Sequence, residues 1–86
     1  MEIIKVSSKS NPNNVASAIS NIIKKDNKID VQVVGAGALN QLVKSIIICR
    51  GLLAPLGINI VCVPSFVNLQ INDSIKTGIK VQVYTT

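Results

Sequence analysis

Four stretches of the chain are predicted to be strands, either from short aliphatic runs or from alternation of hydrophobic and polar residues, whose period of two is typical of strands with one buried face. The stretches are residues 3–6, 29–33, 58–63 with a continuation over 67–71, and 79–83. Pro64 interrupts the third stretch. Because proline cannot donate to a sheet ladder, it either ends that strand or places it at a sheet edge. The Asn-Asp-Ser sequence at 72–74 is a turn signal, which predicts that the last two stretches form a hairpin.

Two other stretches have the three-to-four-residue spacing of helices. Asn11 and Pro12 predict the start of the first, because asparagine caps free amides and proline suits the first helical position. This helix is expected to end near Asp26, and the second to run from about Leu39 to Leu53. The predicted core stripes are Val15, Ala18, Ile19, Ile22 and Ile23 in the first helix and Leu39, Leu42, Val43, Ile46 and Leu53 in the second.

Two aliphatic residues of the second helix, Ile48 and Leu52, fall outside its predicted core stripe. A helix that is apolar on two sides is covered on two sides. We therefore expect Ile48 and Leu52 to form part of a homodimer interface. The alternative is that they are ordinary exposed aliphatic residues.

The predicted element order is β-α-β-α-β-β, and right-handed crossovers place both helices on the same face of one sheet. We predict an α+β fold: a two-layer sandwich with two helices on one face of a mixed four-stranded sheet. A chain of 86 residues suits a single domain, residues 1–86. The uncovered face of the sheet is expected to carry Lys5, Gln32, Lys80 and Gln82.

Composition indicates an aliphatic core and an anionic partner. Hydrophobic residues make up 48% of the chain, and its two aromatic residues are Phe66 and Tyr84. The net charge of +5 favours a polyanion such as nucleic acid. Charged residues near the start argue against a secretory signal, and the longest apolar stretch, 46–60, is interrupted several times. We therefore expect a cytoplasmic protein with no membrane association.

Residue types that carry catalysis are scarce in this chain. There is no histidine, and the four carboxylates are scattered over termini and turns. Without a cluster of cysteine and histidine, no metal site is predicted either. Cys49 and Cys62 lie among aliphatic residues and are interpreted as buried, reduced thiols. We expect no enzymatic activity, no cofactor and no small-molecule substrate.

The Gly-Ala-Gly sequence at 35–37 follows a predicted strand and precedes a helix, where free backbone amides can bind an anion. A dinucleotide-binding motif would need a third glycine at the position of Asn40, so a nicotinamide cofactor is rejected. Gly35 and Gly37 are therefore candidates for a backbone contact with phosphate. The alternative is a tight turn with close packing of the helix.

Four lysines are candidates for phosphate contacts. Lys9 lies in the loop before the first helix, Lys44 on the polar side of the second, and Lys76 and Lys80 on the final hairpin. Phosphate contacts need only positive charge and flexible donors, whereas readers of single strands use stacking aromatic residues, which are missing. These lysines predict a binder of the nucleic-acid backbone. Each could instead be an ordinary solvated lysine.

Three segments resemble the stage V sporulation protein S family: residues 1–12, 34–44 and 50–64. The Gly-Ala-Leu-Asn-Gln block at 37–41 is the most specific of the matching positions, and the resemblance covers essentially the whole chain. It implies a regulatory role in bacterial spore development, late in sporulation and coat assembly.

That family is similar in fold to the Alba-like proteins, which are typically dimers. They bind DNA or RNA through the loop after strand one, the start of helix two and the last hairpin. In this chain those regions hold Lys9, then Asn40 and Lys44, then Lys76 and Lys80. Asn13 and Asn14 are added because short amides can donate to phosphate, although capping the helix is their alternative role. The alternative function is a protein-interaction module of spore development that does not bind nucleic acid.

Overall fold

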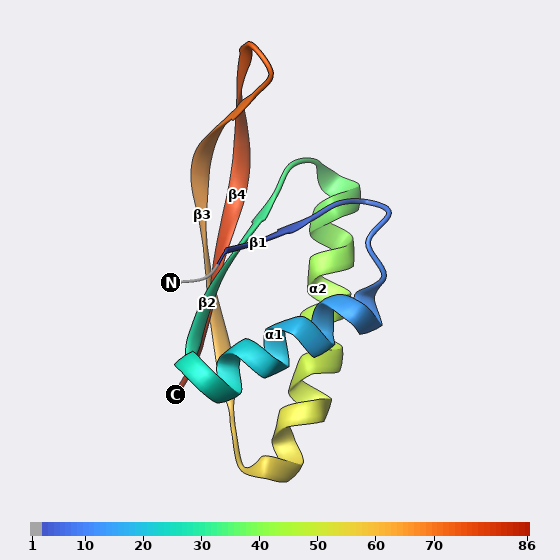
Figure 1. Ribbon diagram of the computed structural model, residues 1–86, viewed down its shortest axis with the longest axis vertical. Helices are drawn as coiled ribbons and strands as arrows, with labels where there is room; N and C mark the ends of the chain where they lie inside the picture. The colour runs from blue at the N-terminus through green and yellow to red at the C-terminus, as the bar shows by residue number, and fades with distance from the viewer. Residues whose placement is uncertain (1–2) are drawn as a thin grey trace.

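The computed structural model describes residues 3–86, which form four strands, two α-helices and a short 3₁₀ helix (Figure 1). In chain order the elements are β1 (Ile3–Val6), α1 (Pro12–Asp26), β2 (Lys28–Val33), α2 (Ala36–Leu53), η1 (Ala54–Leu56), β3 (Ile60–Ile71) and β4 (Ser74–Thr85). The predicted order β-α-β-α-β-β is confirmed.

Both ends of α1 are capped, and they lie where the sequence predicts. The Asn11 side-chain oxygen accepts hydrogen bonds from the backbone amides of Asn13 and Asn14, at 2.9 and 3.2 Å. Pro12 occupies the first helical position, where its missing N–H has no bond to make. Asn27 ends the helix with a φ of 68°, a left-handed conformation that asparagine tolerates.

α2 begins at Ala36, earlier than Leu39, where its apolar spacing predicts the start. Gly35 precedes it with a φ of 90°, which glycine adopts without steric strain. The first helical hydrogen bond runs from the Leu39 amide to the Gly35 carbonyl, at 3.1 Å. The small side chains at 36–38 carry little periodic signal, so the first turn of α2 is hard to see in the sequence.

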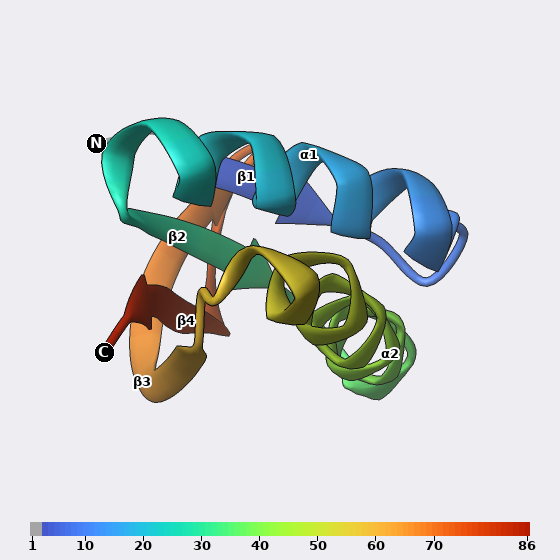
Figure 2. The same cartoon turned by 90° about the horizontal axis from the view of Figure 1, so that it is seen from below.

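The four strands form one sheet in the order β1-β2-β4-β3. β1 and β2 are parallel, and β4 runs antiparallel to both β2 and β3. Figure 2 shows α1 and α2 lying on the same side of these strands. The predicted α+β sandwich, with two helices on one face of a mixed sheet, is confirmed.

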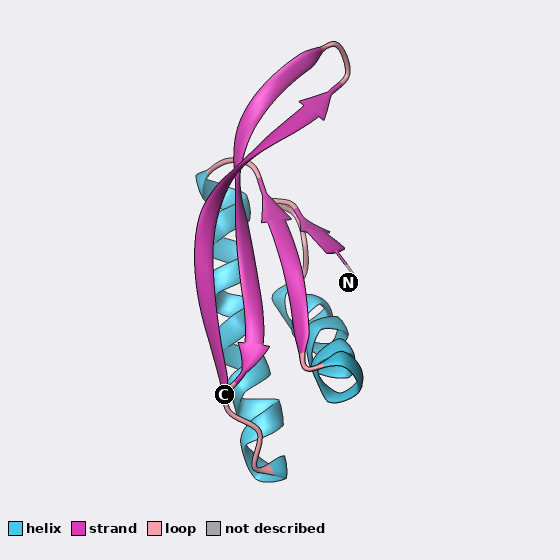
Figure 3. Ribbon diagram, turned by 90° about the vertical axis from the view of Figure 1, so that its left-hand side faces the viewer, coloured by secondary structure: helices cyan, strands magenta, loops and turns pink. Residues whose placement is uncertain are grey.

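β3 and β4 form a hairpin longer than the alternation of their residues predicts. Each strand has 12 residues, and β3 continues through Pro64. Pro64 is tolerated because β3 is the outer strand of the sheet, as the edge alternative predicts. β2 pairs with β4 only as far as Val33 opposite Ile79, so residues 67–78 pair only with each other. Figure 3 shows this distal hairpin projecting beyond the helices.

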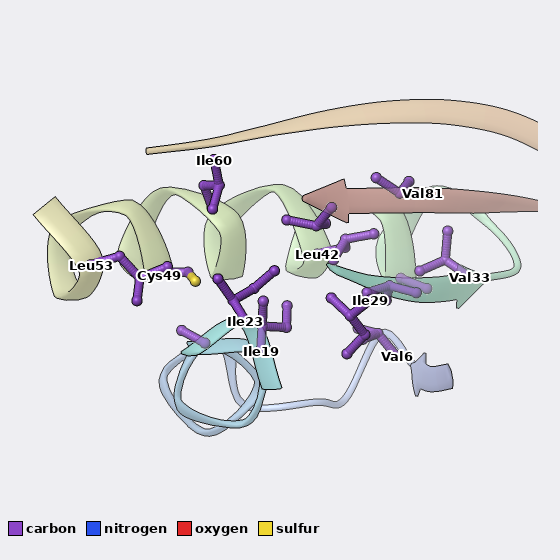
Figure 4. Packing of buried hydrophobic residues seen from close by; sticks show 14 residues of the cluster. Val6, Ile19, Ile23, Ile29, Val33, Leu42, Cys49, Leu53, Ile60 and Val81 are labelled. Carbon is purple, nitrogen blue, oxygen red and sulfur yellow. The ribbon is translucent and has the colours of Figure 1, made fainter. Parts of the chain in front are cut away.

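One cluster of aliphatic side chains fills the space between the helices and the sheet (Figure 4). β2 contributes Ile29, Val31 and Val33, which the alternation predicts to share one face. Cys49 is the exception in this aliphatic cluster, and its sulfur lies 3.1 Å from the Ser20 hydroxyl. These two buried polar groups therefore satisfy each other across the contact between α1 and α2.

α1 buries a slightly different stripe from the predicted one. Ile19 and Ile23 are buried as expected, and Ala16 and Ser20 join them, whereas Ala18 is exposed. The prediction for Ala18 was wrong because small residues occur on both sides of the helix, and hydropathy alone does not rank them.

α2 differs more from its prediction. Leu42 and Leu53 are buried as expected, but Val43 is 47% exposed and Ser45 is fully buried. The Ser45 hydroxyl donates to the Gln41 carbonyl one turn earlier, at 2.7 Å, so it needs no other partner in the core. The prediction that Val43 belongs to the core was therefore wrong.

The sheet face away from the helices carries the polar residues of the alternating strands. Lys5 pairs with Gln32, Gln32 with Lys80, and Lys80 with Ser65, which makes one row across all four strands. Gln82 lies opposite Asp30 in the neighbouring row. The predicted placement of Lys5, Gln32, Lys80 and Gln82 on this face is confirmed.

Together α2 and η1 (Ala36–Leu56) are long and apolar enough to cross a membrane by length and composition alone, with a mean hydropathy of 1.3. The core helix of a soluble protein passes the same test. Here Leu42, Cys49 and Leu53 of α2 pack into the cluster shared with α1 and the sheet. The high hydropathy therefore reflects a helix that is apolar toward the core and again toward β3.

Candidate nucleic-acid interface

Most of the predicted phosphate-binding residues gather at one end of the molecule. β1 and β2 are parallel, so their carboxyl ends lie at the same edge of the sheet. The loops that lead into α1 and α2 leave from this edge, and the distal hairpin projects from the same end (Figure 1). In open sheets, ligands commonly bind outside the carboxyl ends of parallel strands.

The loop after β1 is a hydrogen-bonded turn, called here the 7–10 turn. The Ser10 amide donates to the Ser7 carbonyl at 3.1 Å, and the Ser7 amide donates to the Ser10 hydroxyl at 2.9 Å. The Lys9 amide donates to the Ser7 hydroxyl at 3.2 Å. Serine side chains thus hold the backbone of the turn, and Lys9 is exposed at its tip.

Two contacts tie the 7–10 turn to the start of α2. The Gln41 side-chain amide donates to the Ser10 carbonyl at 2.9 Å. A Cβ atom added to Gly37 would lie 2.9 Å from the Cβ of Ser8, which is too close for any side chain. Gly37 is therefore needed for close packing against the turn, and the predicted phosphate contact of its backbone amide stays a prediction. The turn and the helix form one surface.

Asn40 and Lys44 lie on the side of α2 that faces the turn. Positions 37, 40 and 44 are spaced three and four residues apart, so they share one helix face with the contact between Gly37 and Ser8. Both Asn40 and Lys44 are exposed. The structure thus brings Lys9, Asn40 and Lys44 to one surface, although they are far apart in the sequence.

The start of α1 borders the same surface, because Gln41 of α2 contacts Ser10 just before it. The backbone amides of Asn13 and Asn14 are used by the Asn11 cap, and their side chains are exposed. Gly35 has open space around its Cα, since an added Cβ would meet nothing within 4 Å. Its φ of 90° explains the glycine, and its surroundings leave the backbone accessible.

The hairpin lysines lie on a different face. Lys80 is half-buried in the row with Gln32 on the uncovered face of the sheet. Lys76 is exposed on the distal hairpin, opposite Leu69. Both belong to the same end of the molecule as Lys9, but the sheet separates Lys80 from Lys44. Lys5, in the row with Gln32 and Lys80, joins this second basic group, and the site prediction did not include it.

An apolar surface between α2 and β3, called here the α2–β3 flank, was missed by the sequence prediction. It is lined by Val43, Ile46, Ile47, Arg50, Ile60, Val61 and Cys62. Ile47 is 62% exposed and Val43 is 47% exposed. Positions 43, 47 and 50 repeat at helical spacing, which was the available signal, but the prediction assigned Val43 to the core.

Ile48 was predicted to lie outside the core, but the structure places it against the core. It is partly buried and packs against the hydrophobic cluster. Leu52 is 48% exposed. Ile48 follows Gln41 by seven residues, and Leu52 follows Ile48 by four, so all three share one side of α2. Gln41 contacts Ser10 just before α1, so this side of α2 faces α1. The assignment outside the core was wrong for Ile48, because the buried stripe of α2 is centred on Ser45 and Cys49, closer to Ile48 than predicted. Exposed Leu52 lies outside the core, as predicted.

The two cysteines have different environments. Cys49 is buried, as predicted, and burial raises the pKa of its thiol, while the hydrogen bond with Ser20 acts in the opposite direction. Cys62 is exposed on the α2–β3 flank, so its predicted burial was wrong. Its strand is at the sheet edge, where the helices do not cover it. Residues 3–86 contain no group of three or more His, Cys, Asp or Glu side chains that could hold a metal ion.

The family model of the stage V sporulation protein S family matches residues 2–86. The chain belongs to this family. The predicted family is thereby confirmed, and the segments that suggested it include the 7–10 turn and the first turn of α2, which the structure joins.

This stage V sporulation protein S family member is also similar in structure to Alba from Thermoplasma volcanium. The two share 19% sequence identity with a TM-score of 0.64, over 95% of this chain and 98% of the Alba chain. An identity this low shows a common fold and no more. The predicted Alba-like fold of the sporulation protein is confirmed by this match.

Proposed function

We propose that this member of the sporulation family binds nucleic acid through its phosphates, at the surface formed by the 7–10 turn and the start of α2. The observation that carries the proposal is that two contacts join them. The Gln41 side-chain amide donates a hydrogen bond to the Ser10 carbonyl, and Ser8 packs against Gly37. A pre-ordered turn loses little conformational entropy on binding, so its lysine is presented at low cost.

Charge supports the same surface. Lys9 and Lys44 flank it, and Asn40 adds an amide donor between them. Asn13, Asn14 and the backbone amides at Gly35 and Gly37 supply further neutral donors at two helix starts, where the helix dipole favours an anion. Lys76 extends the positive charge onto the distal hairpin, and Lys80 lies on the sheet face below it.

In this proposal the protein is a cytoplasmic homodimer that acts in sporulation or related development. It works by binding and does not catalyse a reaction. We place the dimer interface on the α2–β3 flank, because Val43 and Ile47 expose apolar surface there. Ile48 is largely occupied by the protein's own core, and Leu52 adds only one exposed residue on the other side of α2.

The test is fluorescence anisotropy with labelled duplex DNA and single-stranded RNA at two salt concentrations. The double variant Lys9→Ala/Lys44→Ala is expected to bind about tenfold more weakly and to show a salt dependence reduced by about two charges. The matched control is Lys24→Ala/Lys25→Ala, which removes two charges at the opposite end of α1 and is expected to bind as the unchanged protein does. If both double variants lose affinity equally, net charge alone accounts for the loss, and the proposed surface is contradicted.

A second function is favoured by the α2–β3 flank, whose exposed aliphatic residues suit a protein partner. In that case the chain is an interaction module of spore development without nucleic-acid binding. Folded protein that binds neither labelled nucleic acid at low salt would support this alternative.

A further inference from the structure

A groove of about 350 Å³ lies where the uncovered sheet face meets the distal hairpin, called here the hairpin groove. One wall is polar and includes Lys5, Gln32 and Ser8. The other wall is aliphatic and includes Val34, Leu69 and Ile71. The volume is near the lower end of the range for small-ligand pockets, about 300 to 1,000 Å³.

The groove depends on Gly78. A Cβ atom there would lie 2.7 Å from the Val33 carbonyl oxygen, 3.1 Å from Leu69 and 3.2 Å from Val34. Because Gly78 has no side chain, Leu69 of β3 reaches across β4 to approach Val34 at the end of β2. The aliphatic wall is thus assembled from strands that are not neighbours in the sheet.

We infer that the hairpin groove receives a single unstacked base of a nucleic-acid strand whose phosphates lie on the proposed binding surface; the inference rests on the proposed function. The groove adjoins that surface, because Ser8 lines it and is also the residue that packs against Gly37. Lys9 follows Ser8 directly in the chain, so a strand whose phosphate binds at Lys9 lies next to the groove.

The chemistry of the two walls suits a base. A base has flat apolar faces, which the aliphatic side chains of Leu69 and Ile71 can cover. Its edge carries hydrogen-bond donors and acceptors, and the Gln32 amide offers one of each kind. Lys5 lies beside Gln32 in the cross-strand row and supplies a charge for the adjoining phosphate. A base paired in a duplex cannot enter, so the groove favours single strands over duplexes.

The test uses single-stranded and duplex oligonucleotides that carry one 2-aminopurine, whose fluorescence rises when the base leaves its stack. We expect this rise on binding of the single strand, with a tighter affinity than for the duplex. The variant Gln32→Ala/Ile71→Ser is expected to lose the rise and to weaken single-strand binding about five- to tenfold, leaving duplex binding within about twofold. Lys28→Ala, at the other end of β2, is the matched control.

The possible outcomes separate this inference from the proposed function. Salt-dependent binding with no change in 2-aminopurine fluorescence, or an undiminished rise in the double variant, would overturn the base-binding groove and leave phosphate binding standing. A folded protein that binds neither oligonucleotide would overturn both. Circular dichroism of each variant shows whether it is folded, and Gln32→Ala alone serves if the double variant is not.

Discussion

Ser45 and Cys49 orient α2, although both side chains are small and serine is polar. Ser45 is fully buried because its hydroxyl is satisfied by the Gln41 carbonyl of the same helix. One turn later, Cys49 meets Ser20 of α1. Small side chains with internal or mutual hydrogen bonds allow the two helices to approach closely, while the larger Val43 is left at the surface.

At the residue scale we predict that the two thiols differ in reactivity. Cys62 is exposed, so we expect a thiol reagent to label it at about the rate of a small free thiol. Cys49 is buried, so we expect it to be labelled only when the protein unfolds. The measurement is the time course of labelling for Cys62→Ala and Cys49→Ala separately. Fast labelling of Cys49 in the folded protein would contradict its burial.

The raised pKa of Cys49 also predicts a pH dependence of stability. The unfolded chain loses this thiol proton at lower pH than the folded chain, so the stabilisation is complete below the ordinary thiol pKa and is lost as pH rises through the folded value. Thermal unfolding at about pH 7.5 and about pH 9.5 should show a smaller decrease in Tm for Cys49→Ala than for the unchanged protein. Equal decreases would mean that other groups cause the effect.

At the element scale, α1 depends on its cap more than on its charges. It has no acidic residue in its first turn, so the Asn11 side chain is the main stabilising group at that end. The cap also sets where the helix leaves the 7–10 turn, since Ser10 precedes Asn11 directly.

We predict that Asn11→Ala destabilises the protein by about 1 kcal/mol, because the amides of Asn13 and Asn14 lose their acceptor. Urea unfolding gives this free energy. Asn21→Ala, at an exposed position within the same helix, is the control and should not destabilise. A cost for Asn21→Ala as large as that for Asn11→Ala would mean that the capping bond contributes little.

The distal hairpin shows the limit of hydrophobic alternation at this scale. Residues 74–78 pair along β3, yet four of the five are exposed and Gly78 has no side chain, so no buried face marks them as a strand. The pairing follows from continuation of the hairpin register and not from a local pattern.

At the scale of the whole molecule, the exposed apolar residues of α2 and β3 predict self-association. We expect the double variant Val43→Glu/Ile47→Glu to be monomeric by analytical ultracentrifugation, because it places two carboxylates in the proposed interface. Both positions are exposed in the protomer, so the fold should persist.

Leu52→Glu is the matched control, since Leu52 is exposed on the opposite side of α2. It should leave the oligomeric state unchanged. A dimer that survives Val43→Glu/Ile47→Glu but is lost in Leu52→Glu would return the interface to the side first predicted from the sequence.

The sequence by itself determined the element order, the sheet faces and the family. Strict alternation in β2 is a local property, and it identified which residues face the helices because a strand has only two faces. The Asn11 and Pro12 start of α1 is equally local, since the cap bonds span at most three residues. The lysines of the 7–10 turn and α2 were predicted from their charge and their place along the chain, and the family resemblance pointed to the same regions.

Only the tertiary structure decided which side of α2 meets the core and which residues share a surface. α2 is apolar in several directions, and periodicity cannot say which of them α1 and the sheet will cover. The tie between the 7–10 turn and α2 joins Ser10 to Gln41, far apart in the chain. The wall of the hairpin groove likewise needs Leu69 to cross Gly78, and such contacts arise from packing, which no local pattern records.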